Sequence, residues 1–426
     1  GSRNVVGLLE GSDEKLKNEY VVVCGHYDHV GDGSKGGSRD KQHIGQVHNG
    51  ADDNASGTSA VLEIAEAFLS MPGKPRRSIV FAFWDAEEIG LKGSGYFVKN
   101  PPIDLSKIAI VLNIDMIGQI DNDNVRVFGS RTSPGLRETL SRANESQGLH
   151  ITFDSPVVRN SDHWSFFQQD IPALLFFGDF TEEYHTARDD IDTLTFPELQ
   201  RIVRLAFILA DDFSGRDEQP PFREASKTEK KDTLSKLFVP ATQIPSRLGI
   251  YWIGMTEIDG QPAGITIKSV LEGSAAAKSG IKPGDRIIGY DGQPLDNDRL
   301  FIRDIMTADE SIELEIIRKA DTEKADPPKT ELTVRLTGQP LPLGLRVGQT
   351  DAEPETVFVT FVAPLSVAAE AEIGVGSRIY SVNGQRFEDR KAFFDLLNHS
   401  TGDVELEVEQ DGRIRKVKLP TGRNAT

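Results

Sequence analysis

The stretch His48-Asn49-Gly50-Ala51-Asp52-Asp53-Asn54-Ala55-Ser56-Gly57 places two adjacent carboxylates in a loop of small residues. It opens directly into Thr58 to Leu69, where apolar side chains recur at helical spacing, so we expect a helix there. An aspartate at a helix N-terminus is commonly a cap that accepts backbone N–H groups. The alternative is a metal ligand, and the choice depends on whether other ligand-type residues occupy similar positions in the chain.

Such residues do follow other apolar runs that are typical of buried strands. Side chains two apart on a strand share a face, so His26 and Asp28 suit an imidazole ligand whose second nitrogen is held by a carboxylate. The runs and the polar residues after them are Tyr20 to Cys24 with Gly25-His26-Tyr27-Asp28, Ser78 to Trp84 with Asp85-Ala86-Glu87-Glu88, Ile108 to Ile114 with Asp115, and Ile171 to Phe177 with a loop containing Tyr184-His185-Thr186.

The alternation of apolar strands and amphipathic helices over the first 210 or so residues predicts an α/β domain with a mixed, largely parallel sheet flanked by helices. Ligands bind at the carboxyl ends of the strands in such sheets. The five candidate ligands fall at such ends or at a loop mouth beside one: His26, Asp53, Glu88, Asp115 and His185.

Composition excludes several classes of protein. A chain of 426 residues is expected to form two or three domains, and its net charge of −18 argues against a nucleic-acid partner. No apolar run is long enough to span a membrane. The single cysteine, Cys24, lies in an apolar run and is expected to be a buried small hydrophobe rather than a nucleophile. The chain opens Gly1-Ser2-Arg3 without a methionine, so we expect any export signal to lie outside the given sequence.

A charged, proline-containing segment separates the α/β region from an internal repeat. Residues 281–288 resemble residues 373–380, and Asp291-Gly292-Gln293 matches Asn383-Gly384-Gln385 at an offset of 92 residues. Each copy follows a Leu-Gly-aliphatic triplet, so the unit is a small domain of about 90 residues used twice. The expected segments are an enzyme domain at 1–213, a linker at 214–240, and two β-rich domains at 241–337 and 338–422.

Two histidines and three carboxylates, one of them free to bridge, suit two zinc ions. Taken together, the motifs resemble the di-zinc aminopeptidases of peptidase family M28 over about residues 4 to 212, and the repeats resemble PDZ domains. The motifs that carry the first resemblance are Gly25-His26-Tyr27-Asp28, Gly50-Ala51-Asp52-Asp53-Asn54-Ala55-Ser56-Gly57, Glu87-Glu88-Ile89-Gly90, Asn113-Ile114-Asp115-Met116 and Tyr184-His185-Thr186.

The resemblance implies a zinc exopeptidase-like fold and a role for each motif residue. One zinc ion would be held by His26, Asp53 and Asp115, and the other by Asp53, Glu88 and His185. Glu87 would be the general base, and Asp28 would orient His26. A cis peptide is implied between Asp53 and Asn54. Asp162, His163 and Asp189 also match family positions, without an assigned role.

The PDZ resemblance places two triplets at the loops that bind a peptide carboxylate, which would let the domains recruit protein C-termini. These triplets are Leu248-Gly249-Ile250 and Leu343-Gly344-Leu345.

The sequence therefore predicts a zinc-dependent aminopeptidase that removes N-terminal residues from peptides and carries PDZ-like domains for substrate or partner recruitment. The family resemblance further implies an exported protein of the periplasm, cell envelope or extracellular space. Two alternatives stay open: a glutaminyl cyclase-like or carboxypeptidase reaction on the same fold, and a catalytically inert PDZ scaffold.

Overall fold

The computed structural model describes residues 3–231, 247–258, 262–321, 324 and 327–420. These residues fall into two compact units. The first comprises residues 1–235 with the short segments 350–354 and 409–414, and the second comprises residues 236–349, 355–408 and 415–426. Within the described part of the chain, no helix is long and apolar enough to cross a membrane.

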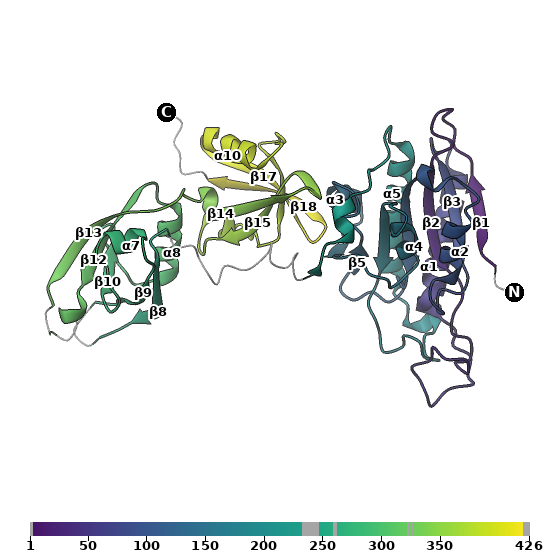
Figure 1. Cartoon of the computed structure of the whole chain (residues 1–426), viewed down its shortest axis with the longest axis horizontal. Helices are drawn as coiled ribbons and strands as arrows, with labels where there is room; N and C mark the ends of the chain where they lie inside the picture. Colours follow the sequence, from purple (N-terminus) through teal and green to yellow (C-terminus); the bar gives the residue numbers. More distant parts are fainter. Residues whose placement is uncertain (1–2, 232–246, 259–261, 322–323, 325–326, 421–426) are drawn as a thin grey trace. The chain divides into compact units, whose positions relative to one another are not determined.

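The first unit is built on a seven-stranded mixed sheet with the order β1-β3-β2-β4-β7-β5-β6 (Figure 1). The central pairs β3·β2, β2·β4 and β4·β7 are parallel, as is β5·β6, whereas β1·β3 and β5·β7 are antiparallel. This confirms the expected mixed, largely parallel sheet. The strands are β1 Val5–Leu9, β2 Tyr20–His26, β3 Ser78–Trp84, β4 Ile108–Asp115, β5 Asn124–Phe128, β6 His150–Asp154 and β7 Ala173–Phe177.

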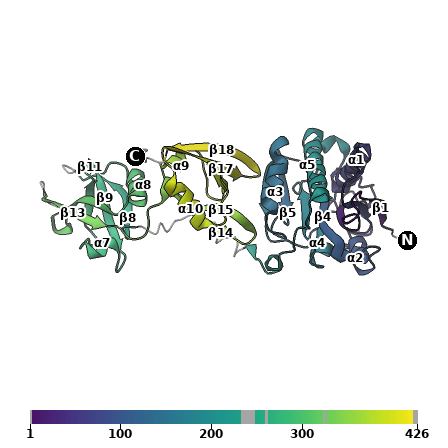
Figure 2. The ribbon, with the colours of Figure 1, turned by 90° about the horizontal axis from the view of Figure 1, so that it is seen from above.

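Helices cover both faces of this sheet, as Figure 2 shows. Side chains alternate along β2, so that Val21 and Val23 pack on one face and Val22 and Cys24 on the other. The first face is covered by α1 (Gly57–Ser70), α3 (Leu136–Ala143) and α5 (Phe196–Gly215), and the second by α2 (Lys92–Lys99) and α4 (His163–Phe167). The runs expected to be buried strands are therefore apolar because both of their faces are covered.

Most elements of the α/β region lie where the apolar patterns predict them, but β5 and β6 were not expected. Their five-residue stretches flank a short helix and mix buried side chains with partly or fully exposed ones. Asp121 to Asn124 closes a turn through a hydrogen bond from the Asn124 N–H to the Asp121 oxygen, 3.0 Å. This turn precedes β5, which pairs with β6 and β7 and not with β4.

Among the described residues the two repeats have the same order of helices and strands, except that the short strand β11 of the first has no counterpart strand in the second. The first contains β8 (Ile250–Thr256), β9 (Gly264–Val270), α7 (Ala275–Lys278), β10 (Arg286–Tyr290), β11 (Gln293–Pro294), α8 (Asp298–Thr307), β12 (Ser311–Ile317) and β13 (Lys329–Arg335). The second contains β14 (Leu345–Thr350), β15 (Glu353–Val362), α9 (Val367–Glu370), β16 (Arg378–Val382), α10 (Arg390–His399), β17 (Asp403–Gln410) and β18 (Arg413–Pro420).

The offset of 92 residues seen in the motifs extends to whole elements. It relates α8 at 298–307 to α10 at 390–399, and β10 at 286–290 to β16 at 378–382. The first repeat forms one sheet with β8 at its edge, and the second forms another with β14 at its edge. Two β-rich domains of the expected kind therefore follow the α/β region. Residues 232–240 of the expected linker lie outside the described residues, as do residues 241–246 and 421–422 at the ends of the two expected β-rich domains, and the bounds of the four expected segments stay predictions.

Candidate metal centre

The predicted ligands converge at the carboxyl ends of neighbouring parallel strands. His26 is the last residue of β2, Asp115 is the last residue of β4, and Glu88 follows β3 by four residues. His185 lies in the loop after β7, and Asp53 lies in the distorted turn Ala51–Ser56 that leads into α1. Because β3, β2, β4 and β7 are adjacent in the sheet, all five side chains meet at one edge.

His26, Asp53 and Asp115 form a first group whose ligand atoms lie within 4.8 Å of one another. The His26 Nε2 atom is 3.2 Å from Asp53 Oδ1 and 3.2 Å from Asp115 Oδ1. All three residues are buried. The second Asp115 oxygen, Oδ2, accepts a hydrogen bond from the Ser161 hydroxyl at 2.6 Å, which fixes the carboxylate in place.

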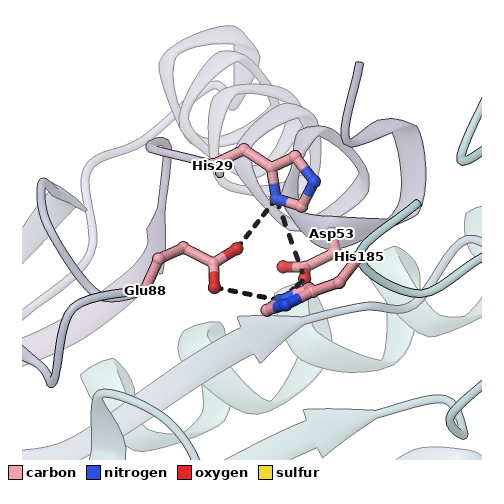
Figure 3. A group of neighbouring side chains, drawn as sticks. All are labelled: His29, Asp53, Glu88 and His185. Carbon is pink, nitrogen blue, oxygen red and sulfur yellow. Dashed lines mark hydrogen bonds and ion pairs between the residues drawn. The ribbon is translucent and has the colours of Figure 1, made fainter. Parts of the chain in front are cut away.

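Asp53, Glu88 and His185 form a second group, to which the structure adds His29 (Figure 3). The His185 Nε2 atom is 3.0 Å from Asp53 Oδ2 and 2.9 Å from Glu88 Oε2. His185 Nδ1, on the other side of its ring, lies 2.8 Å from the Gly37 carbonyl oxygen. His29 was not among the residues selected from the sequence, although it directly follows Asp28.

Asp53 belongs to both groups through different oxygens. Its Oδ1 atom faces His26 of the first group, and its Oδ2 atom faces His185 of the second. A carboxylate that can serve two sites at once is the arrangement required of a bridging ligand.

Hydrogen bonds from several directions hold the turn that carries Asp53. The backbone N–H groups of Asp52 and Asp53 donate to the two carboxylate oxygens of Asp189, at 2.8 and 3.0 Å. Asn54 follows a cis peptide bond, as the family resemblance implied, and its amide donates to the backbone oxygens of His26 and Ile114. Asp189, which had no role from the sequence, therefore positions Asp53.

Asp28 connects the loops after β2 and β3. Its backbone oxygen lies 3.1 Å from His26 Nδ1, and its carboxylate Oδ1 lies 3.7 Å from the same atom. The carboxylate also accepts the backbone N–H groups of Glu87 at 3.0 Å and Glu88 at 3.4 Å. Asp28 thus lies against the His26 ring and also fixes the backbone of both glutamates, while its role in orienting His26 stays a prediction.

Glu87 lies beside the two groups without belonging to either of them. The pKa of its carboxyl group is raised to about 9, chiefly by burial, with a smaller contribution from the nearby carboxylates of Asp115 and Asp162 and an opposing effect of His26. A cation bound next to it would favour its ionised form. The protonation state of Glu87 is therefore tied to whatever cation the neighbouring residues hold.

The donor set fits metal cations. Asp53, Glu88 and Asp115 are clustered, and within the part of the chain that the structure describes their ion-pair partners are all histidines. Burial alone would lower the pKa of His26, but Asp115, Asp28 and Asp53 raise it well above its ordinary value. Burial likewise opposes the effect of Asp53 and Glu88 on His185, whose pKa rises to about 10. Carboxylates and imidazoles so arranged could hold two zinc-type ions.

Other residues noted in the sequence lie outside the two groups. Cys24 is fully buried, as expected, with its thiol 3.4 Å from Asn113 Oδ1. Asp162 accepts a hydrogen bond from Ser94, and His163 is buried in α4. The loop histidine His48 lies 2.9 Å from the Ser38 hydroxyl and is in neither group.

The two Leu-Gly-aliphatic triplets precede edge strands, as a PDZ peptide site requires. Leu248 is buried, and Ile250 begins β8. In the second repeat, Leu343 and Gly344 lie in the short 3-10 turn η7 (Pro342–Gly344) and Leu345 begins β14. The peptide-binding role of all six residues stays a prediction.

Two regions of the chain match known families. Residues 4–210 match the family model for peptidase family M28, and residues 241–316 match the PDZ domain. The chain is 36% identical over 145 residues to leupeptin-inactivating enzyme 1 of Streptomyces exfoliatus. This match covers 33% of this chain and 32% of that protein. It is 28% identical over 245 residues to aminopeptidase YwaD of Bacillus subtilis. This match covers 55% of this chain and 48% of that protein.

A third relative is named as a probable glutamate carboxypeptidase, LAMP1 of Arabidopsis thaliana, with 31% identity over 232 residues covering 48% of this chain and 30% of that protein. Among solved structures, BSAP, a zinc aminopeptidase from Bacillus subtilis, has 25% identity and a TM-score of 0.42, covering 52% of this chain and 53% of that chain. The chain spans between about a third and a half of the length of these curated relatives.

Proposed function

Because residues 4–210 form a peptidase family M28 domain, we propose that this protein is a zinc-dependent aminopeptidase that uses two metal ions. The observation that carries the proposal is the position of Asp53, whose two oxygens face two separate groups of ligand atoms. His26, Asp53 and Asp115 would hold one ion, and Asp53, Glu88 and His185 the other. The inert-scaffold alternative is disfavoured, because a domain without chemistry has no need of such a buried cluster of carboxylates.

The two ions would supply an activated water and would polarise the scissile carbonyl group. Glu87 would accept a proton from the attacking water and pass it to the leaving amine. Asp28 would fix the positions of Glu87 and His26 relative to each other, since it accepts a hydrogen bond from the Glu87 N–H and lies against the His26 ring. Asp189 would keep Asp53 between the two groups through its hydrogen bonds to the loop backbone.

The adjacent glutamates allow a direct test. Glu87→Gln keeps size and polarity but removes the proton acceptor, so turnover should fall by roughly 10²- to 10⁴-fold while bound zinc and substrate affinity stay unchanged. Glu88→Gln instead weakens a metal ligand, so its loss of activity should accompany loss of zinc and be partly restored by added zinc. Zinc per chain is measured by mass spectrometry of the metal, and activity by release of free amino acids.

The opposite pattern, with zinc lost from the Glu87 variant and retained by the Glu88 variant, would reverse the two roles. Full activity in both variants would contradict the proposed mechanism as a whole.

Product analysis separates the proposed reaction from its alternatives. A peptide that is free at both ends should lose its N-terminal residue. Release of the C-terminal residue would indicate a carboxypeptidase, the activity named for one of the relatives. Loss of ammonia from a peptide with N-terminal glutamine, without chain cleavage, would indicate a cyclase.

We also propose that the PDZ domain matched at residues 241–316 recruits peptides or partner proteins through their C-termini. The edge position of β8 supports this role, because an extended peptide can add to an edge strand. Export to the periplasm, cell envelope or extracellular space likewise remains part of the proposal.

A further inference from the structure

His29 and His185 occupy equivalent positions around the same two carboxylates (Figure 3). The His29 Nδ1 atom is 2.8 Å from Glu88 Oε1 and 3.8 Å from Asp53 Oδ2. His185 Nε2 is 2.9 Å from Glu88 Oε2 and 3.0 Å from the same Asp53 Oδ2. The two imidazole rings meet edge to face with their centroids 5.5 Å apart. Each ring directs one nitrogen into the space between Asp53 and Glu88 (Figure 3).

The spacing of these atoms suits direct coordination of one ion. Zinc binds nitrogen and oxygen ligands at about 2.0 to 2.2 Å, which places the donors of a tetrahedral site roughly 3.3 to 3.6 Å apart. Of the four distances between donors from the histidines and the carboxylates, three are 0.3 to 0.5 Å shorter than that range, at 2.8, 2.9 and 3.0 Å, and one is 0.2 Å longer, at 3.8 Å, so small side-chain shifts would bring all four into it. The side chain of His29 is 10% exposed, which leaves little room for water to take its place.

We propose that His29 Nδ1 is a fourth protein ligand of the ion held by Asp53, Glu88 and His185. This inference rests on the proposed two-metal function and deepens it. The ion would receive two imidazole nitrogens and two carboxylate oxygens, and the proton of the neutral His29 ring would reside on Nε2. The other group, His26, Asp53 and Asp115, supplies three residues and so leaves a coordination position open, as catalytic zinc sites do.

The alternative role for His29 is to donate a hydrogen bond from Nδ1 to Glu88 and so orient that ligand from outside the coordination sphere. Loss of such an outer partner typically lowers metal affinity by 10- to 100-fold. Loss of a direct ligand should lower it further. The distinction therefore needs a measurement that detects the metal–ligand bond itself.

A cysteine at position 29 provides this measurement. The coordinating Nδ1 is separated from the His29 Cβ by a single ring atom, and a cysteine sulfur is bonded to Cβ and forms a longer bond to the metal, about 2.3 Å. A thiolate at this position should therefore reach the same ion. His29→Cys loaded with Co²⁺ should show a thiolate-to-cobalt charge-transfer band in the near ultraviolet. The starting protein is the control for this band, since its one cysteine, Cys24, is buried and outside both ligand groups.

The second measurement is chelator competition on the full chain. The starting protein should bind two Zn²⁺ ions, and His29→Ala should bind one of them at least about 100-fold more weakly while the other is retained. His43→Ala is the matched control, because His43 lies in the neighbouring loop, pairs with Asp40 and is in neither group. Its two affinities should equal those of the starting protein.

The outcomes separate this inference from the proposed function. A starting protein that binds fewer than two ions would overturn the two-metal proposal itself. Two ions in the starting protein with unchanged affinities in His29→Ala would overturn the role of His29 alone. A weakened ion in His29→Ala without a charge-transfer band in His29→Cys would also overturn coordination, because it would leave only the outer hydrogen bond to Glu88.

Discussion

Asp53 is the residue on which both ligand groups depend, because its two carboxylate oxygens face different imidazoles. Burial would raise the pKa of this carboxyl group, but hydrogen bonds with His185 and His26 hold it below its usual range. An ionised Asp53 is the form that a metal needs. The Asp189 carboxylate adds to this arrangement by holding the backbone of the Asp53 turn rather than by approaching a metal.

His163 gives the stability of the enzyme domain a pH dependence that can be isolated by substitution. The residue is fully buried in α4, and burial lowers its pKa to about 3 from an ordinary value of about 6.5. Between these two values the unfolded chain binds a proton at this position that the folded chain does not, so stability falls as the pH falls below about 6.5.

The prediction is that His163→Gln, which cannot titrate, removes this contribution. On lowering the pH from 7.5 to 5.5, the starting protein should lose about 1.4 kcal/mol more of its free energy of unfolding than the variant does. Denaturant unfolding of both proteins, stripped of metal by a chelator, measures the difference at each pH. A difference between the two proteins that is the same at both pH values would contradict the assigned burial effect.

Four of the five candidate ligands could be picked out in the sequence because each follows an apolar run, whereas Asp53 precedes a run of helical spacing. The assignment of all five to two metal ions came from the family resemblance and stays a prediction. His29 could not be found in this way. Its approach to Glu88 depends on how the loops after β2 and β3 fold back toward each other, and neither loop has a periodic signal. The same reason applies to Asp189, which reaches the Asp53 turn from a loop more than 130 residues along the chain.

At the scale of secondary structure elements, apolar patterning predicted the buried strands and not β5 and β6 at one end of the sheet. β3 and β4 are almost entirely buried, and their sequences are nearly continuous apolar runs. β5 and β6 are five residues long, lie at one end of the sheet and carry polar side chains among their apolar ones. The antiparallel pairing of β5 with β7 is set by tertiary packing, for which the local sequence gives no signal.

Arg77 links the start of β3 to the C-terminal end of α5. It is fully buried immediately before β3, pairs with Glu19 at 2.8 Å and donates to the backbone oxygen of Phe213 at 3.1 Å. It also donates to the backbone oxygens of Arg216 and Asp217, just after the end of α5. A basic side chain at this position satisfies carbonyl groups that the helix leaves without partners.

We therefore predict that Arg77→Met lowers the free energy of unfolding of the enzyme domain by about 3 to 5 kcal/mol, because it leaves Glu19 and several carbonyl groups without their partner. Arg76→Met is the matched control. Arg76 is 41% exposed and pairs with Asp13 and Asp217 at the surface, so its replacement should cost about 1 kcal/mol or less. Denaturant titration followed by circular dichroism measures both values, and equal losses in the two variants would contradict the role given to Arg77.

At the scale of the whole molecule, the chain combines an α/β domain that carries the candidate metal centre with two copies of a β-rich domain. The internal repeat predicted these copies because two motifs recur at one offset of 92 residues, which α8 and α10 also keep. Function need not be duplicated with the fold. In the second copy, the Gly344 N–H donates to the Leu341 oxygen at 2.9 Å, and the Leu345 N–H donates to the Pro342 oxygen. Two N–H groups that a peptide carboxylate would need are thus engaged within the loop itself.

Because the PDZ family model matches residues 241–316, within the first repeat, and the loop of the second repeat uses two of its own N–H groups, we predict that the full chain binds one peptide C-terminus, at the first repeat. An N-acetylated peptide that ends in an apolar residue with a free carboxyl group should bind the metal-depleted protein with a stoichiometry of one. Its C-terminally amidated form should bind about 10- to 100-fold more weakly, because it lacks the charge that strengthens hydrogen bonds from the loop. Acetylation and metal depletion prevent the enzyme domain from processing the peptide during titration calorimetry.

A matched pair of glycine substitutions assigns the site. Gly249 and Gly344 hold equivalent positions with φ of 79° and 81°, and an added Cβ would lie 2.2 Å from the Ser274 side chain in one case and 2.4 Å from that of Ser366 in the other. Both replacements by alanine should therefore distort their loops to a similar degree. Gly249→Ala should abolish peptide binding and Gly344→Ala should preserve it, with circular dichroism confirming that each variant is folded. Equal affinity for the free and amidated peptides would show that neither repeat recognises a carboxylate, and loss of binding in Gly344→Ala alone would place the site in the second repeat.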